Sequence, residues 1–108
     1  IFCPTLKGNI PDCGAIGMLI EKTTGKKSIN NFGKPSDLMI NYINTIIDKD
    51  HNKIVVGDRI HTDIELGKKI GADTVLVCTG EFQNSKNDNL KIDNTQIFNT
   101  LTDYLITI

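Results

Sequence analysis

The sequence IVVGDRIHTDIELG, residues 54–67, decides the fold because it joins an apolar strand to a helix. Residues 53–56 (KIVV) form a β-branched run typical of buried strands in parallel sheets. Residues 62–65 (TDIE) match the capping box S/T-x-x-E and predict a helix that Gly71 ends. A second buried strand is predicted at residues 73–78 (DTVLVC). This order of strand, helix and strand predicts an α/β fold with a parallel sheet and flanking helices.

Three further helices are predicted from caps and apolar periodicity. Asp12 is a suitable N-cap for a helix over residues 13–24, which Gly25 would end. Residues 35–48 carry an apolar stripe at helical spacing, and residues 97–105 fit a final amphipathic helix.

The remaining segments contain few regular signals. Residues 1–11 are predicted to be irregular because they contain two prolines and a glycine. A short strand is expected within residues 26–33, and the polar, Asn-rich residues 81–95 predict a loop. Two strands cannot form a well-covered parallel sheet. Residues 54–56 are therefore expected to have a bare flank, or one covered by another copy of the chain or by disordered protein.

Composition excludes several classes of function. The chain has 108 residues, a net charge of −1, 39% hydrophobic and 23% charged residues, which is typical of a soluble globular domain or part of one. Its basic residues do not cluster with aromatic ones, so nucleic acid is not an expected partner. No apolar run reaches the roughly 18–20 residues that span a bilayer. Three cysteines without metal-ligand spacing predict free thiols and a cytoplasmic location.

Asp58 is the first candidate for a functional residue. It follows the strand at Val56 and Gly57, and the carboxyl ends of parallel strands are the usual functional edge of an α/β sheet. A carboxylate there suits Mg²⁺, which takes one or two protein carboxylates together with waters and phosphate oxygens; the alternative is a turn leading into the helix. Asp63, in the first turn of that helix, is explained equally well as a charge at a helix end or as a group that orients the metal's waters.

Lys34 is the second candidate. In FGKPSD, Pro35 is expected at the first helical position, which places Lys34 at or next to the N-cap. A cation there opposes the helix dipole unless an anion binds at the same place, and the alternative is a solvated lysine. His61 either lines the same site or is an exposed loop residue, and His51 lies in a polar loop.

Two motifs in order give the chain a family resemblance. GKPS at residues 33–36 and GDRIHTDI at residues 57–64 resemble motifs III and IV of the haloacid dehalogenase superfamily of phosphatases. The branch most similar is that of p-nitrophenylphosphatases, phosphoglycolate phosphatases and pyridoxal phosphatases. The resemblance implies that residues 1–30 are the end of an α/β cap domain and that residues 31–108 are the C-terminal part of a HAD-like, Rossmann-like core.

The resemblance also implies a mechanism. In this superfamily an aspartate attacks phosphorus, and water then hydrolyses the aspartyl-phosphate. By match of motifs, Asp58 would hold Mg²⁺, Asp63 would orient the metal or its waters, and Lys34 would pair with the nucleophile and the phosphate.

The sequence departs from the family pattern in one respect. No DxD nucleophile motif follows an apolar strand, since Asp48 and Asp50 lie in a polar loop after a helix, and the motif II Ser/Thr is also missing. With Ile1 in place of an initiating Met, we expect the C-terminal fragment of a Mg²⁺-dependent phosphatase. The whole protein would hydrolyse a small phosphorylated metabolite, the fragment would be inactive by itself, and homo-oligomer formation stays open.

Two alternatives to the phosphatase remain at this stage. One is a non-catalytic phosphate-binding or interaction module of the same fold that has lost the nucleophile. The other is an unrelated α/β domain such as a receiver. Receivers also use carboxylates at strand ends and a lysine, but their lysine follows the acidic pocket in sequence, whereas Lys34 precedes Asp58.

Overall fold

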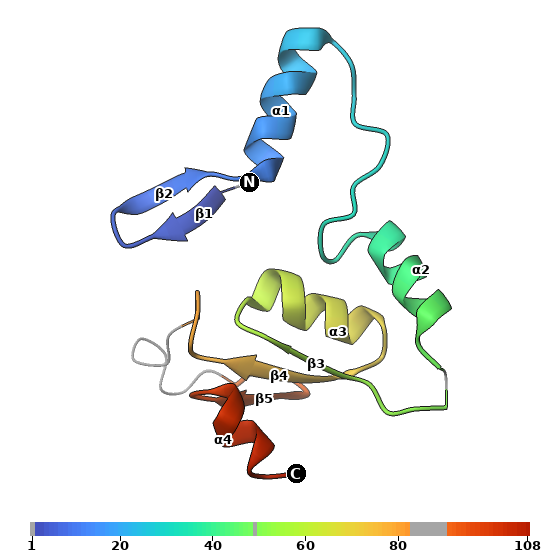
Figure 1. Cartoon of the computed structure of the whole chain (residues 1–108), viewed down its shortest axis with the longest axis vertical. Coiled ribbons are helices and arrows are strands. Elements are labelled where there is room, and N and C mark those ends of the chain that lie inside the picture. The colour runs from blue at the N-terminus through green and yellow to red at the C-terminus, as the bar shows by residue number, and fades with distance from the viewer. Residues whose placement is uncertain (1, 49, 83–90) are drawn as a thin grey trace. The chain divides into compact units, whose positions relative to one another are not determined.

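The computed structural model describes residues 2–48, 50–82 and 91–108 and divides the chain into two compact units (Figure 1). The first unit is Ile1–Asn31 and the second is Phe32–Ile108. The second unit contains all the candidate site residues.

A β-hairpin begins the first unit. β1 (Phe2–Thr5) pairs antiparallel with β2 (Gly8–Pro11), so the prediction of an irregular segment over residues 1–11 was wrong. A two-stranded hairpin has two outer edges, and a proline whose missing N–H would point to such an edge costs no ladder hydrogen bond. Gly8, with φ of 117°, provides the backbone conformation that ends the turn.

The helix after the hairpin confirms the capping signals. α1 (Cys13–Thr24) begins after Asp12, whose carboxylate accepts a hydrogen bond of 2.7 Å from the amide of Cys13. It ends at Gly25, which has φ of 68° and donates its amide hydrogen to the carbonyl of Glu21. Residues 26–33, all of which the structure describes, contain no strand, so that expectation was wrong.

The second unit begins with a helix that is shorter than predicted. α2 (Asp37–Ile46) replaces the predicted helix over residues 35–48. Its N-cap is Ser36, whose hydroxyl accepts a hydrogen bond from the amide of Met39. Lys34 therefore lies two residues before the N-cap, and the peptide bond between Lys34 and Pro35 is cis.

A parallel sheet of three strands is the centre of the second unit. Its order is β3 (Ile54–Gly57), β4 (Asp73–Val77) and β5 (Thr95–Phe98). β3 and β4 were predicted, but β5 was missed, and the helix predicted over residues 97–105 is reduced to α4 (Leu101–Leu105). Of the predicted loop over residues 81–95, residues 83–90 lie outside the described residues, and Thr95 belongs to β5.

The capping box occurs at a different threonine from the one predicted. Thr100 accepts a hydrogen bond from the amide of Asp103, and the Asp103 carboxylate accepts one from the amide of Thr100. Thr62 makes no such bond. It lies inside the π-helix η1 (Ile60–Ile64), and its hydroxyl is buried without a hydrogen-bond partner in the described part of the chain.

The helix between β3 and β4 follows η1 directly. α3 (Glu65–Lys69) is the continuation of the π-helical segment. Gly71, with φ of 65°, follows the end of α3, in agreement with its predicted role as the stop signal.

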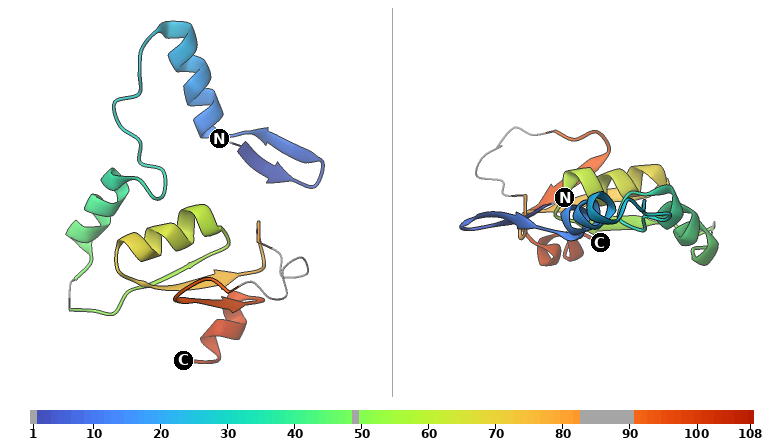
Figure 2. Two further views of the ribbon diagram at one scale, coloured as in Figure 1. Left: turned by 180° about the vertical axis from the view of Figure 1, so that it is seen from behind. Right: turned by 90° about the horizontal axis from the view of Figure 1, so that it is seen from above.

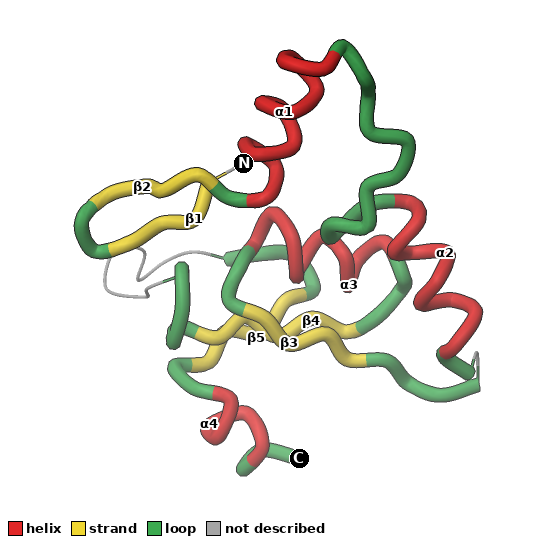
Figure 3. The backbone as a smooth tube through the Cα atoms, turned by 45° about the horizontal axis from the view of Figure 1, so that its top comes forward, coloured by secondary structure: helices red, strands yellow, loops and turns green. Residues whose placement is uncertain are grey.

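Helices cover both faces of the sheet. α3 lies on one face and α4 on the other, as the views in Figures 1, 2 and 3 agree. Side chains of β4 alternate between two small apolar clusters, one on each face. Leu76 packs with Ile64 and Phe82 in one cluster, and Val75 and Val77 pack with Tyr104 in the other.

β3 is an edge strand. Among the described residues no strand pairs with its outer side, as the sequence led us to expect. Its side chains are only partly covered, with Ile54 46% and Val56 37% exposed, so the predicted burial of residues 53–56 was wrong for these two. In the described ranges no helix is long and apolar enough to cross a membrane.

The contact between α3 and the sheet gives a test of the fold. A Cβ added at Gly67 would overlap the side chain of Thr74 and lie 3.2 Å from the Cβ of Val55. We expect Gly67→Ala to lower the free energy of unfolding by about 1–3 kcal/mol through overpacking, as measured by urea denaturation. Gly17→Ala in α1, where a Cβ would meet nothing within 4 Å, is the control. Equal stability of the two variants would contradict the packing described.

Candidate functional site

The candidate site lies where β3 and β4 end. Both strands run in the same direction, and Gly57 of β3 is in register with Leu76 of β4. The segments that leave the two strands therefore start at the same edge of the sheet. Asp58 begins one segment and Cys78 begins the other.

Asp58 is held by the segment that follows β4. Its Oδ2 atom accepts a hydrogen bond of 2.7 Å from the amide of Glu81, and its carbonyl oxygen accepts one of 3.1 Å from the amide of Phe82. A Cβ at Gly80 would overlap the Asp58 carboxylate. The Gly80–Phe82 loop thus packs against both the side chain and the main chain of Asp58.

Asp63 is the buried carboxylate of the site, with 6% of its surface exposed. Its Oδ1 atom forms an ion pair of 2.5 Å with the Nζ atom of Lys34, and its Oδ2 atom accepts a hydrogen bond of 3.2 Å from the amide of Arg59. A Cβ at Gly57 would overlap the Asp63 side chain. The π-helical turn of η1 therefore folds this carboxylate back onto the end of β3.

These contacts bring the predicted residues to one place. Lys34 forms an ion pair with Asp63, and Asp63 accepts a hydrogen bond from the amide of Arg59, which follows Asp58 in the chain. Lys34 reaches this place from the turn before α2 rather than from the N-cap of the helix, so the local reason given for it from the sequence was wrong. His61 is exposed.

The donor set suits a hard cation next to an anion. Two carboxylates and one ammonium group gather at the strand end, and Gly80 leaves the Asp58 carboxylate space that a Cβ would fill. Within the described residues, the Oδ1 atom of Asp58 accepts no hydrogen bond, and no group of three or more His, Cys, Asp or Glu side chains could hold a metal. Oxygen donors of this kind suit a hard divalent cation that takes one or two protein carboxylates and completes its shell with waters and ligand oxygens.

Sequence reasoning predicted a loop from residue 81 onward but did not assign the Gly80–Phe82 segment to the site. Arg59 and Glu81 form an ion pair with 2.6 Å between Nε and Oε2, and neither was a candidate. A signal was present, because the Thr79–Gly80 dipeptide comes one residue after the end of β4, an apolar strand that is parallel to β3. Residues that follow neighbouring parallel strands are expected to meet.

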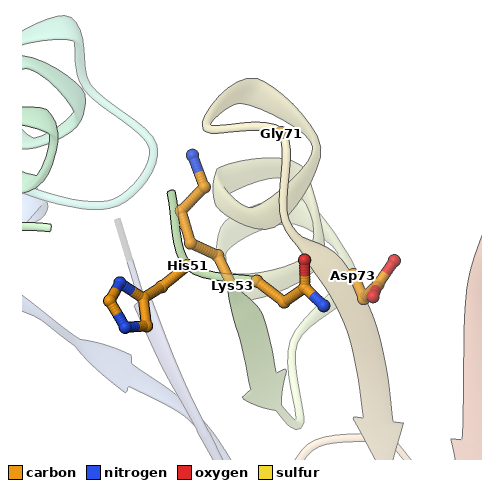
Figure 4. Close-up of a pocket in the computed structure, with 5 residues that line it drawn as sticks. His51, Lys53, Gly71 and Asp73 are labelled. Atoms are coloured by element: carbon orange, nitrogen blue, oxygen red, sulfur yellow. The ribbon is translucent and has the colours of Figure 1, made fainter. Parts of the chain in front are cut away.

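A hollow at the other edge of the sheet is separate from this site. It has a volume of about 310 Å³ and lies near the amino ends of β3 and β4 (Figure 4). His51, Asn52, Lys53, Gly71 and Asp73 line it. The ammonium group of Lys53 already donates to the carbonyl of Ile70, and His51 contacts Asp48 in an exposed loop. No residue of the candidate site lines this hollow.

Comparison with known proteins places the chain in a family. A family model described as HAD-hydrolase-like matches residues 31–104. The chain is 30% identical over 101 residues to dihydroxyacetone phosphatase from Corynebacterium glutamicum, covering 93% of this chain and 36% of that protein. It is 37% identical over 75 residues to the ribonucleotide monophosphatase NagD of Escherichia coli K12, covering 68% of this chain and 30% of that protein.

Solved structures agree with these relatives. The p-nitrophenyl phosphatase from Archaeoglobus fulgidus matches with a TM-score of 0.72 and 34% identity, covering 99% of this chain and 43% of that one. The chain therefore spans less than half the length of each of these three proteins.

The ion pair between Lys34 and Asp63 gives a second test. Lys34→Ala would leave a buried carboxylate without its charged partner, which we expect to lower the free energy of unfolding by about 1–3 kcal/mol. The lower part of this range applies because the lysine side chain is 49% exposed. Lys69→Ala, an exposed lysine on α3, is the control and should change stability by less than about 0.5 kcal/mol.

A double-mutant cycle isolates the pair. Asp63→Asn combined with Lys34→Ala should cost less than the sum of the two single changes, because the second change removes a partner that is already lost. Strict additivity in urea denaturation would show that the two side chains do not interact in solution.

Proposed function

Because this chain belongs to the HAD-like hydrolase family, we propose that it is the C-terminal part of a Mg²⁺-dependent phosphatase that hydrolyses small phosphomonoesters. The observation that carries the proposal lies at the end of β3. There the Asp63 carboxylate binds both the ammonium group of Lys34 and the amide of Arg59, the residue that directly follows Asp58. A cytoplasmic location is also proposed, because the three cysteines of the chain are free thiols, which a reducing compartment favours.

Asp58 is proposed as the protein ligand of the metal. The amide of Glu81 holds one carboxylate oxygen and thereby leaves the other for a cation. Bound Mg²⁺ would neutralise the charge of a phosphate ester and help orient it for displacement. The hard oxygen donors of this turn support Mg²⁺ over a thiolate-binding metal.

Lys34 and Asp63 are proposed to act together on the anion. The buried Asp63 carboxylate fixes the ammonium group of Lys34 near the end of β3. A fixed ammonium stabilises the negative charge that gathers when a carboxylate nucleophile meets a phosphate. Through its hydrogen bond to the amide of Arg59, Asp63 also sets the direction of the chain directly after Asp58, which suits a role in orienting the metal's surroundings.

The nucleophile is proposed to come from sequence outside these 108 residues. Asp48 pairs with the exposed His51 in the segment that leads to the amino end of β3, the edge of the sheet opposite Asp58. The side of β3 with which no described strand pairs offers a place for a further parallel strand, whose carboxyl end would then lie beside Asp58. Residues 1–30, which make up nearly all of the first unit, are proposed to be the end of a cap domain, and residues 31–108 the C-terminal part of the core.

The test is hydrolysis of p-nitrophenyl phosphate by the complete gene product, with and without Mg²⁺. We expect activity to require Mg²⁺ and Asp58→Asn to lower it by about 100-fold or more, since a metal contributes several kcal/mol to charge stabilisation. Asp73→Asn is the matched control, because Asp73 is an exposed aspartate at the opposite edge of the sheet. It should leave the rate unchanged.

Two results would overturn the proposal. Activity that is indifferent to both Mg²⁺ and Asp58→Asn would remove the metal assignment. A complete gene product that binds inorganic phosphate but never hydrolyses a phosphomonoester would favour a non-catalytic phosphate-binding module. The 108-residue chain alone is expected to be inactive.

A further inference from the structure

Glu81 is bound at both ends to the turn that carries Asp58. Its amide donates to the Oδ2 atom of Asp58 at 2.7 Å, and its carboxylate pairs with the guanidinium of Arg59 at 2.6 Å. Arg59 is the residue directly after Asp58. The two contacts thus close a small ring that runs from Asp58 through Arg59 and Glu81 back to the Asp58 carboxylate.

This ring is anchored on its other side by apolar packing. Phe82, the residue after Glu81, is 9% exposed and packs with Ile64 and Leu76, and its amide donates to the carbonyl oxygen of Asp58. The main chain of the Gly80–Phe82 loop is therefore fixed at Phe82 by the core. The Glu81 side chain forms an ion pair with Arg59.

We propose that Arg59 and Glu81 are positioning residues that set the orientation of the Asp58 carboxylate. The inference rests on the proposed function, because it assigns Asp58 to the metal. The ion pair holds the Glu81 amide against Oδ2, so that Oδ1 is the oxygen presented to the cation. It also neutralises a second carboxylate beside Asp58, which would otherwise repel that group or compete with it for the cation.

The ion pair acts locally rather than on overall stability. Its side chains are 34% and 42% exposed, and pairs with this exposure add little to the free energy of folding. Outer partners of metal ligands nevertheless change metal affinity by about 10- to 100-fold, because they fix the ligand's direction. Arg59 and Glu81 are thus expected to affect binding of Mg²⁺ and not the melting temperature.

The test compares four variants of the complete gene product: Arg59→Ala, Glu81→Gln, their combination, and Arg59→Lys. Lys68→Ala is the matched control, because it removes the Lys68–Glu65 ion pair on α3, whose side chains are 40% and 42% exposed. Binding of Mg²⁺ is measured by titration calorimetry. Protection of the Glu81 amide against hydrogen exchange is measured by NMR in the metal-free protein, where activity plays no part.

We expect Arg59→Ala and Glu81→Gln each to weaken Mg²⁺ binding by about tenfold and to remove the protection of the Glu81 amide. Their combination should be no worse than either change alone, since both break the same contact. Arg59→Lys should restore part of the affinity, because an ammonium group keeps the charge but not the planar geometry. Raising the Mg²⁺ concentration should recover kcat.

The outcomes separate this inference from the proposed function. If Asp58→Asn abolishes activity while Arg59→Ala and Glu81→Gln bind Mg²⁺ as tightly as Lys68→Ala does, the positioning role is overturned and the function stands. If Arg59→Ala raises KM for p-nitrophenyl phosphate with no change in Mg²⁺ affinity, Arg59 contacts the substrate instead, which also overturns the inference. If Asp58→Asn is fully active, the proposed function itself fails.

Discussion

Two carboxylates at the end of one strand require hydrogen-bond or ion-pair partners, and these partners come from distant parts of the second unit of this protein. Asp63 is almost fully buried, and a buried charge is tolerated only when it is paired and hydrogen-bonded. Lys34 forms the ion pair with Asp63, and the amide of Arg59 donates the hydrogen bond. The ion pair requires that the turn before α2 lies at the end of β3. Asp58 is less buried and takes its partners from the segment after β4. Three parts of the sequence are thus joined at one edge by polar contacts.

Glycines make this crowding of polar groups feasible. A Cβ at Gly57 would overlap Asp63, and a Cβ at Gly80 would overlap Asp58. The two carboxylates therefore occupy volume that side chains would fill at an ordinary strand end. The π-helical turn of η1 has a related effect, since it carries Asp63 back to the strand where a regular helix start would have used Thr62 as its cap. Residues 62–65 match a capping box in sequence, but the turn adopts the conformation that buries the Asp63 carboxylate.

Local signals predicted those parts of the fold in which local and tertiary preferences agree. Asp12 and Gly25 marked the ends of α1 correctly because capping involves only neighbouring residues. β5 was missed because Ile97 and Phe98 have helical spacing with the residues after them, while their pairing with β4 depends on residues about 20 positions away. Asp58 was found as a candidate from its place after a strand, and Asp63 and Lys34 from their places near helix starts; the resemblance of motifs then implied their roles. The ion pair of Lys34 with Asp63 could not be predicted from its place near a helix start. Arg59 and Glu81 were missed because their contact exists only once β3 and β4 lie side by side.

The two central strands differ in burial although their sequences are alike. Ile54–Val56 is as apolar and β-branched as Val75–Val77, yet Ile54 and Val56 are 46% and 37% exposed while Val75 is 1% exposed. β4 has a strand on each side and helices over both faces, whereas β3 pairs with one strand among the residues that the structure describes. Continuous apolar runs are typical of strands that are covered on all sides. The composition of β3 is thus typical of a strand with more cover than the described residues give it.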